Sequence, residues 1–358
     1  MEHMTTTVQT AGAAAGPVTG SAGSTRGTGS TASAGRSPSA VSAVSAVSFQ
    51  QVSKAYGEVR AVDGLTLDLY PGETVALLGP NGAGKSSTLD LLLGLRRPDS
   101  GTVRVFGTSP RDAIAAGRVG AMLQSGGLMD GVTVRELVGL ACELHPRPHR
   151  VHDVLAAAGL AQIADRKVDK LSGGQEQRVR FAVATAGASD LIVLDEPTTG
   201  MDVTARQAFW ATVREQADQG RAVLFATHYL EEADAVADRV LVLHRGRLLA
   251  DGTAAGIKAR AGIRKVSFDL LDADARGTAG PVLEQRLRKL PFLSALTVSH
   301  AGSAAGSGLT VRLQSTDADA TVHALYGLGL HPRNLEVAGL GLEQAFVAIT
   351  AAEEARTA

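Results

Sequence analysis

The chain has 358 residues, of which 44% are hydrophobic and only 4% aromatic. At a typical domain size this length predicts about 2.4 domains. Its 35 basic and 36 acidic side chains give a net charge of -1, a balance without the electrostatic signature of nucleic-acid or anionic membrane binding. The single cysteine, Cys142, excludes an internal disulfide framework and a cysteine-based zinc site. No apolar run approaches the ~18 residues of a transmembrane helix, so we expect that the chain does not span a membrane by itself.

The first 45 residues differ in composition from the rest of the chain. Between Thr5 and Ala40 nearly every residue is Ala, Gly, Ser or Thr, and no acidic residue occurs between Glu2 and Glu58. A segment so poor in large apolar groups cannot bury enough surface to offset the entropy lost on ordering, so we predict a disordered tail over 1–45. The tail also lacks the charged start and apolar centre of a secretory signal, so we do not expect export of the chain.

Strand and helix signals begin near Val47. Residues 61–69 alternate apolar and polar side chains as in an antiparallel strand, and Pro71-Gly72 then marks a turn. The later apolar runs are uninterrupted and alternate with helical patterns, which is typical of an α/β fold with a parallel sheet covered on both faces. We expect strands at 61–69, 74–78, 102–106, 118–123, 191–194 and 222–227. We expect helices within 133–170, where Thr133 and Glu136 have capping-box spacing, and at 150–158, 176–187 and 204–219.

After Gly256 the pattern changes to that of a small α+β domain. We expect strands at 265–271, 295–299 and 309–314, helices near 282–290, 317–328 and 341–352, and a loop over the run of Gly, Ala and Ser at 301–308. The predicted organisation is a tail at 1–45, a cassette at 46–256 with a helical subdomain at about 130–180, and an accessory domain at 257–358.

A glycine-rich motif follows the strand expected at 74–78. It matches the phosphate-binding loop pattern and comprises Gly79, Pro80, Asn81, Gly82, Ala83, Gly84, Lys85 and Ser86, with Ser87 next in the chain. Glycines let the backbone N–H groups point at a phosphate, where the following helix adds its positive end. Lys85 would reach the β- and γ-phosphates, and the Ser86 hydroxyl would bind Mg²⁺. A chance glycine turn is the alternative, and the strand before and the helix after the motif argue against it.

A second glycine motif, Leu171-Ser-Gly-Gly-Gln175, stands just before a predicted helix. An ordinary helix start explains Ser172 as N-cap and Gln175 as its reciprocal partner. It does not explain Gly173 and Gly174, which each cost about 1 kcal/mol in a helical first turn. Two bare N–H groups at a helix N-terminus suit the close approach of a γ-phosphate. This pentapeptide resembles the signature sequence of the ATP-binding-cassette (ABC) ATPases.

Two further segments place polar side chains at the ends of predicted strands. The apolar strand 191–194 leads into Asp195 and Glu196, and the strand 222–227 leads into His228. Ligands bind at this edge of open parallel sheets. Solvated acids and a surface histidine are the alternative interpretation, and the two motifs upstream make it the weaker one.

The resemblance implies a P-loop nucleotide-hydrolase cassette with an antiparallel β subdomain and a helical subdomain, and ATP and Mg²⁺ as its cofactors. It implies that Asp195 binds Mg²⁺ through water, that Glu196 is the general base, and that His228 contacts the γ-phosphate and holds Glu196. The remaining roles implied by the resemblance are Mg²⁺ sensing by Gln124, stacking on adenine by Tyr56, and γ-phosphate contact by Ser172, Gly173, Gly174 and Gln175. Glu176 departs from many relatives, which carry a basic or neutral polar residue there, and we expect it to weaken closure slightly.

The chain holds one phosphate loop and one signature. The resemblance implies that the phosphate loop of one copy faces the signature of a second, giving a two-fold dimer, most simply a homodimer, around two ATP molecules. Residues 196–202 and 226–234 are similar to the exporter branch that includes daunorubicin-resistance ATPases, and 342–346 loosely match its C-terminal motif. The implied protein drives a separate transmembrane permease, for drug or antibiotic efflux, at the cytoplasmic face of the bacterial membrane. Leu128 and Met129 are candidates for the permease-facing groove, with burial in the core as the alternative.

A soluble relative that acts on ribosomes or DNA is the alternative from another class. Ribosomal relatives carry two cassettes, whereas this chain has one phosphate loop. The short segment from Ser86 to Leu171 lacks the long heptad coiled coil of a DNA-repair ATPase. The neutral charge also disfavours a polyanion, so we expect no nucleic-acid partner. An inactive regulatory cassette is a third interpretation, which the intact motif residues Lys85, Asp195, Glu196 and His228 argue against.

Overall fold

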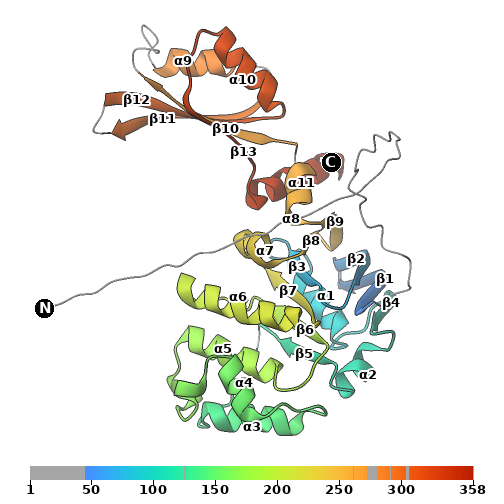
Figure 1. Ribbon diagram of the computed structural model, residues 1–358. Coiled ribbons are helices and arrows are strands. Elements are labelled where there is room, and N and C mark those ends of the chain that lie inside the picture. Colours follow the sequence, from blue (N-terminus) through green and yellow to red (C-terminus); the bar gives the residue numbers. More distant parts are fainter. Residues whose placement is uncertain are drawn as a thin grey trace, which may run out of the picture. The chain divides into compact units, whose positions relative to one another are not determined.

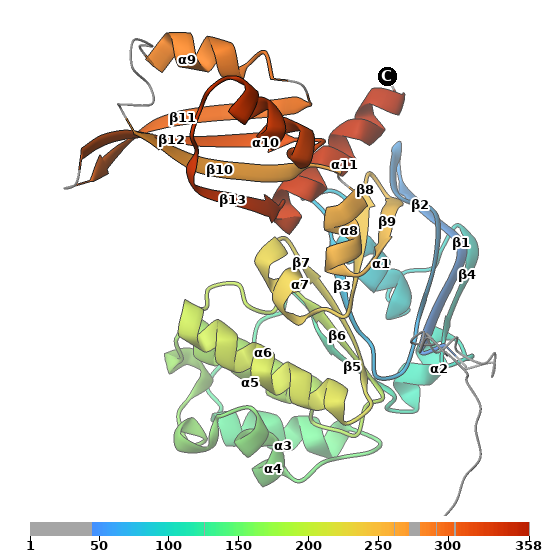
Figure 2. The same cartoon turned by 45° about the horizontal axis from the view of Figure 1, so that its top comes forward.

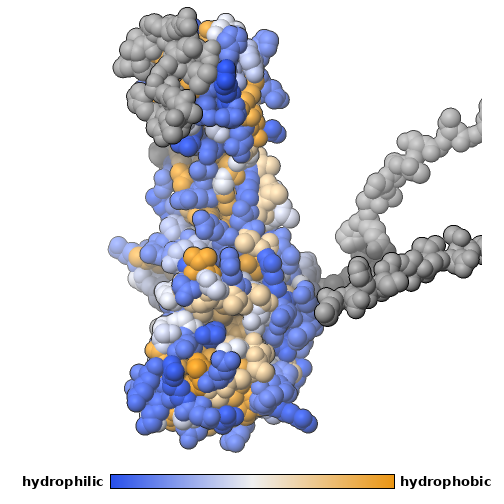
Figure 3. Space-filling view, turned by 60° about the vertical axis from the view of Figure 1, so that its left-hand side comes forward, coloured by the Kyte–Doolittle hydropathy of each residue, from blue (hydrophilic) through white to orange (hydrophobic). Residues whose placement is uncertain are grey.

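The computed structural model describes residues 45–124, 126–260, 262–271, 280–290, 292–303 and 306–357. The expected disordered tail, apart from its last residue, lies outside the described residues. No helix in these described ranges is long and apolar enough to cross a membrane. On the face drawn in Figure 3, hydrophilic residues predominate and apolar residues lie between them in small patches.

A six-stranded sheet forms the centre of the cassette (Figure 1). Its strands, in spatial order, are β5 (Val119–Met122), β6 (Leu191–Asp195), β7 (Ala222–Thr227), β3 (Thr74–Leu78), β8 (Arg239–His244) and β9 (Arg247–Gly252). All neighbours pair in parallel except β8 and β9. β3, β6 and β7 are buried along their whole length, as expected for a parallel sheet covered on both faces. The α/β fold class is therefore confirmed.

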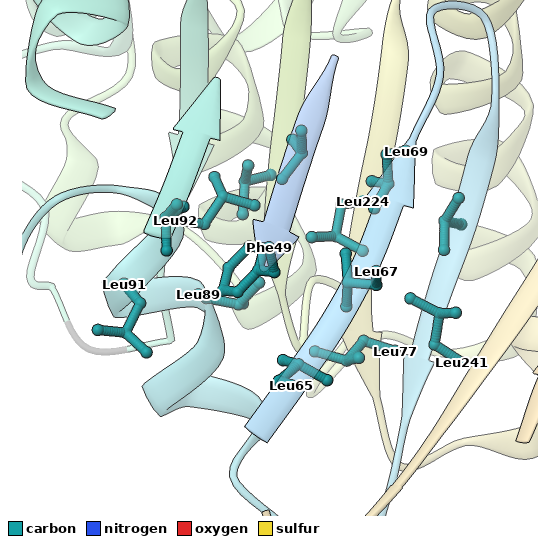
Figure 4. Packing of buried hydrophobic residues seen from close by; sticks show 14 of the residues in the cluster. Phe49, Leu65, Leu67, Leu69, Leu77, Leu89, Leu91, Leu92, Leu224 and Leu241 are labelled. Carbon is teal, nitrogen blue, oxygen red and sulfur yellow. The ribbon is translucent and has the colours of Figure 1, made fainter. Parts of the chain in front are cut away.

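A smaller antiparallel sheet covers one face of the central sheet. It comprises β2 (Val59–Leu69), β1 (Val47–Tyr56) and β4 (Ser100–Val105), in that order. Between the two sheets lies a core that includes Phe49 of β1, Leu77 of β3, Leu224 of β7 and Leu89 of α1 (Lys85–Leu92), as Figure 4 shows. The short helix α2 (Pro110–Ala115) adds Ala113 to the same core. This packing fixes β3 and α1, and with them the loop that joins the two elements.

Helices pack on the opposite face of the central sheet. They are α6 (Val203–Asp218), α7 (Leu230–Val236) and α8 (Ala254–Arg260), with the end of α5 (Gly173–Ala184). A chain of aromatic rings runs from Phe181 through Phe209 and Trp210 to Phe225 of β7, with centroids 4.5 to 5.5 Å apart. These contacts attach the helix that carries the signature motif to the strand that leads into His228.

The helical region has a core of its own, and Figure 2 shows α3, α4 and α5 together at one end of the cassette. α3 (Val134–Leu144) begins with a capping box formed by Thr133 and Glu136, as predicted, and α4 is Val151–Ala157. Single turns at Ala161–Ile163 and Val168–Lys170 lead to α5. Leu128 packs against this core, whereas Met129 is 51% exposed.

The C-terminal region contains a four-stranded antiparallel sheet in the order β11 (Leu293–Ser303), β12 (Gly306–Ser315), β10 (Arg264–Leu271) and β13 (Arg333–Gly339). α9 (Gly280–Leu287) and α10 (Ala318–Gly327) contribute to its core. The expected loop over 301–308 is wrong, because β11 and β12 pair as far as Ser303 and Gly306. β13 was not predicted. α11 (Leu342–Thr357) contributes Leu342, Phe346 and Ile349 to the cassette core, whereas the predicted domain limits placed it in the accessory domain.

Candidate nucleotide-binding site

The phosphate loop connects the end of β3 to α1, and its own chain requires its glycines. Gly84 is the N-cap of α1 with φ of 102°, a conformation that L-residues rarely adopt, and an added Cβ would overlap the carbonyl oxygen of Ala61. A Cβ on Gly79 would lie 2.6 Å from the carbonyl oxygen of Leu243. Packing inside the cassette therefore requires glycine at both of these positions of the loop.

Lys85 lies across the loop. Its side-chain Nζ donates hydrogen bonds to the carbonyl oxygens of Gly79, at 2.7 Å, and Pro80, at 3.3 Å. Burial lowers the pKa of Lys85, and the nearby carboxylates of Glu196 and Asp195 oppose that shift. The ammonium group is thus held between the loop and the two acids predicted to share its site.

Asp195 ends β6 beside α1. Ser86 Oγ donates a hydrogen bond of 3.3 Å to Asp195 Oδ2, while Asp195 Oδ1 is buried and has no partner among the residues that the structure describes. Burial raises the pKa of Asp195, and the Ser86 hydrogen bond and Lys85 partly offset this. A hydroxyl next to an unsatisfied buried carboxylate oxygen fits a hard cation such as Mg²⁺. Within the described ranges no group of three His, Cys, Asp or Glu side chains could hold a metal alone, so a nucleotide's phosphates and water would complete the coordination.

Glu196 and His228 meet at the carboxyl ends of two adjacent strands. His228 Nδ1 lies 2.6 Å from Glu196 Oε2, and the Glu196 side chain is 7% exposed, against 46% for His228. Glu196 has φ of 50°, a strained conformation for a residue with a side chain, and its N–H donates to the Ala226 carbonyl at 2.9 Å. Strained backbone of this kind persists only where the surrounding structure holds it.

A buried glutamate that we did not predict lies behind this pair. Glu232 of α7 is 3% exposed and accepts hydrogen bonds from Thr198 Oγ1 and, at 3.0 Å, from Thr227 Oγ1. Arg206 Nε of α6 lies 3.4 Å from Glu232 Oε1. The carboxylate therefore joins the segment after Glu196 to the strand end before His228. Its position four residues after His228, on the inward face of a short helix, is the sequence signal that could have found it.

The signature motif begins α5, and its glycines have room. Ser172 and Gln175 form a complete capping box, as predicted. A Cβ on Gly173 would lie 3.7 Å from the nearest atom, the Gly200 carbonyl oxygen, and one on Gly174 would lie 3.8 Å from Met201 Cγ. Both distances are ordinary van der Waals contacts, and neither glycine has positive φ. No hydrogen bond between described residues joins the signature to the phosphate loop.

The remaining predicted residues lie at the edges of the site. Tyr56 is the last residue of β1 and is 42% exposed. Gln124 is exposed, and its only described hydrogen bond is through its carbonyl oxygen, 3.4 Å from Arg180 Nη1. Arg180 Nη2 also lies 2.6 Å from Glu176 Oε1, so the unusual acid of the signature helix is paired one turn later.

The fold and this cluster of loop, lysine, serine, acids and histidine define a P-loop nucleotide-binding hydrolase. A family model described as ABC transporter matches residues 62–199. The Nod factor export ATP-binding protein I of Paraburkholderia xenovorans is 40% identical over 216 residues, which are 58% of this chain and 71% of that relative. The daunorubicin/doxorubicin resistance ATP-binding protein DrrA of Streptomyces peucetius is 38% identical over 242 residues, or 65% and 73%.

Solved structures agree. The ATP binding subunit of an ABC transporter is 26% identical with a TM-score of 0.56, covering 68% of this chain and 99% of that chain. A bacterial ABC transporter cassette solved as a dimer is 26% identical with a TM-score of 0.53, covering 58% and 98%. The chain therefore belongs to the ABC transporter family, as an ATP-binding, ATP-hydrolysing subunit of the exporter type.

Proposed function

We propose that this chain forms a two-fold homodimer around two ATP molecules and drives a separate transmembrane permease that exports drugs or antibiotics. It would work at the cytoplasmic face of the bacterial membrane, held there by the permease. The efflux substrate class rests on the relative named for daunorubicin and doxorubicin resistance. We also propose the domain limits 46–256 for the cassette and 257–358 for the accessory domain, with the last helix, α11, packed against the cassette core.

The observation that carries the hydrolytic role is the 2.6 Å contact between His228 Nδ1 and Glu196 Oε2. This contact occupies one carboxylate oxygen and orients the side chain, and Oε1 of Glu196 has no hydrogen-bond partner among the described residues. We assign Oε1 to accepting a proton from the attacking water. His228 would then hold the base in line and contact the γ-phosphate from its exposed face.

The other site residues would bind and orient the nucleotide. Lys85 would exchange the carbonyl oxygens of Gly79 and Pro80 for the β- and γ-phosphates. Ser86 and Asp195 would hold Mg²⁺, with Gln124 sensing it, and the ion would neutralise charge on the phosphates when bound. The exposed ring of Tyr56 is available to stack on adenine.

The dimer is supported by the signature glycines, since no contact with the described residues of their own chain requires glycine there. Side chains at Gly173 and Gly174 would fit the fold, so the demand for bare backbone comes from outside it. A γ-phosphate bound to a second copy is the ligand that two free N–H groups at the start of α5 would accept. In this arrangement the Arg180 pair reduces the repulsion that Glu176 would exert on the phosphate.

Glu196→Gln tests the hydrolytic role and the dimer together. The amide cannot accept the proton, so turnover should fall by about a hundredfold or more, while ATP with Mg²⁺ still binds and gives a dimer on a sizing column. Glu231→Gln, which removes an exposed acid of α7, is the matched control and should keep parental turnover. A monomeric Glu196→Gln protein with the parental rate would refute the proposal.

The permease contact needs a separate test. Leu128 is partly buried against the helical core, so an acid there would also destabilise the region, whereas Met129 is 51% exposed. Met129→Asp should abolish co-purification with the permease and keep ATP binding. Leu144→Asp, at the exposed end of α3, is the control that should co-purify normally. Unchanged co-purification of Met129→Asp would remove this residue from the permease interface.

A further inference from the structure

A second polar pocket lies at the edge of the central sheet opposite the phosphate loop. Arg118 precedes β5, Asp190 precedes β6 and Arg221 precedes β7, and these strands are adjacent and parallel. Backbone hydrogen bonds fix the three positions, from Asp190 N to the Arg118 carbonyl and from Ala222 N to the Asp190 carbonyl. The strands separate this edge from Gly79, Asp195 and His228 by roughly 15 Å at ~3.3 Å per residue.

Three guanidinium groups share this pocket of about 480 Å³. Arg147 reaches it from the loop between α3 and α4 and lies 3.2 Å from Asp190, while Arg118 Nε lies 2.7 Å from the same carboxylate. Asp190 is the only carboxylate that lines the pocket, so the cluster carries two positive charges in excess. The aromatic ring of Phe106 lies under the Arg118 guanidinium, at 3.8 Å, and holds it in place.

The cluster holds more positive charge than its carboxylate balances. Burial and the like charge of Arg147 lower the pKa of Arg221, with only Asp190 opposing them. Arg221 binds neutral partners, Gln216 Oε1 at 2.5 Å and His149 Nε2 at 3.2 Å. Clustered cations of this kind attract an anion.

We propose that this pocket binds a phosphate-bearing anion at a site distinct from the nucleotide site. Arginine forks match phosphate oxygens in pairs, and three of them converge here. The anion is either a free phosphorylated compound or the headgroup of an anionic phospholipid, since both present the same oxygens. The neutral charge of the whole chain does not conflict with this, because the positive excess is local.

Calorimetry with pyrophosphate tests the site in the full chain carrying Lys85→Ala, which weakens binding at the phosphate loop. In that background Arg118→Gln with Arg221→Gln should weaken pyrophosphate binding by at least about tenfold. Arg147→Gln alone should also weaken pyrophosphate binding. It should not destabilise the fold, because the Arg147 side chain is 43% exposed and Asp190 keeps its ion pair with Arg118. Arg96→Gln with Arg97→Gln, two exposed arginines elsewhere, is the charge-matched control and should bind as the background does.

Vesicles distinguish the two sources of the anion. Arginine-dependent co-sedimentation with phosphatidylglycerol vesicles, and not with phosphatidylcholine vesicles, would identify a lipid headgroup. Saturable pyrophosphate binding without vesicle binding would identify a free compound, and both outcomes support the site. Equal affinity in all variants, or no saturable binding of either probe at millimolar concentration and low salt, would overturn it.

Discussion

The phosphate loop and the signature are both glycine-rich and both lead into helices, but their glycines have different causes. In the phosphate loop the chain itself excludes side chains, through the positive φ of Gly84 and the close approach of Leu243 to Gly79. At the signature, side chains at Gly173 and Gly174 would make only ordinary van der Waals contacts on helical backbone, so the cassette would fold with alanine there. Glycine therefore marks internal packing in the phosphate loop, whereas in the signature it fits the approach of another molecule that we propose.

Gly84→Ala should have the largest effect on stability, because packing inside the cassette requires glycine at this position. The new Cβ would overlap the Ala61 carbonyl and the residue would keep an unfavourable φ, so the free energy of unfolding should fall by about 3 kcal/mol or more. Urea denaturation measures this. Gly82→Ala is the control, with positive φ but open space around it, and should lose only about 1 kcal/mol. Equal losses in the two variants would show that backbone strain alone, and not the contact with Ala61, requires glycine.

Gly174→Ala should have the opposite profile. Its unfolding free energy should stay constant or rise by up to about 1 kcal/mol, since alanine favours a helical first turn. Turnover should fall by about tenfold or more, because the methyl group would stand between α5 and the phosphate of a second copy. Parallel measurement of denaturation and ATP hydrolysis separates the two effects. Full ATPase activity of Gly174→Ala would contradict this, because it would show that no ligand needs bare backbone at the signature.

Features of the site that depend on short stretches of sequence could be predicted. Gly79 to Ser86 and Ser172 to Gln175 were identified from spacing, and the structure has the predicted strand, loop and helix at the first and the complete capping box at the second. Asp195, Glu196 and His228 were expected at one sheet edge because buried strands preceded them, and the structure brings them together there. The assigned roles of these residues stay predictions until they are tested by mutation.

Features that depend on tertiary contacts could not be read in this way. No sequence pattern reveals the strained φ of Glu196. The place of Glu232 on the inward face of α7 indicates burial, but it does not reveal the bond to Thr198, 34 residues away. Residues 301–303 and 306–308 have poor strand propensity, yet they pair with each other because β11 and β12, which already pair before them, continue into them. Packing likewise decides where α11 lies, since its pattern indicates a helix and not the core that receives it.

Asp195→Asn tests the buried carboxylate beside the phosphate loop and leaves the glycines of the loop unchanged. Burial raises the pKa of Asp195 in the folded chain. As the pH rises from the ordinary pKa of an aspartate towards this raised value, the unfolded chain loses its proton first, so the free energy of unfolding falls. The neutral amide should remove this cost and raise the Tm of the ligand-free protein by about 2 °C at neutral pH. It should also abolish stabilisation by Mg²⁺ added with ATP. A lower Tm would mean that the Asp195 carboxylate stabilises the fold and that its burial does not destabilise it.

Glu176→Gln should have the smallest effect, and it sharpens the signature side of the comparison. Glu176 is 40% exposed and its ion pair with Arg180 is a one-turn helix pair, so removing it should change the free energy of unfolding by about 0.5 kcal/mol or less. If the pair already compensates the acid near the phosphate, turnover should change by less than about twofold. Arg180→Gln is the informative partner, because it leaves Glu176 unpaired and releases the Gln124 carbonyl, and it should lower turnover more than Glu176→Gln does. Equal rates in both variants would mean that charge beside the signature does not matter, and that its glycines act through shape alone.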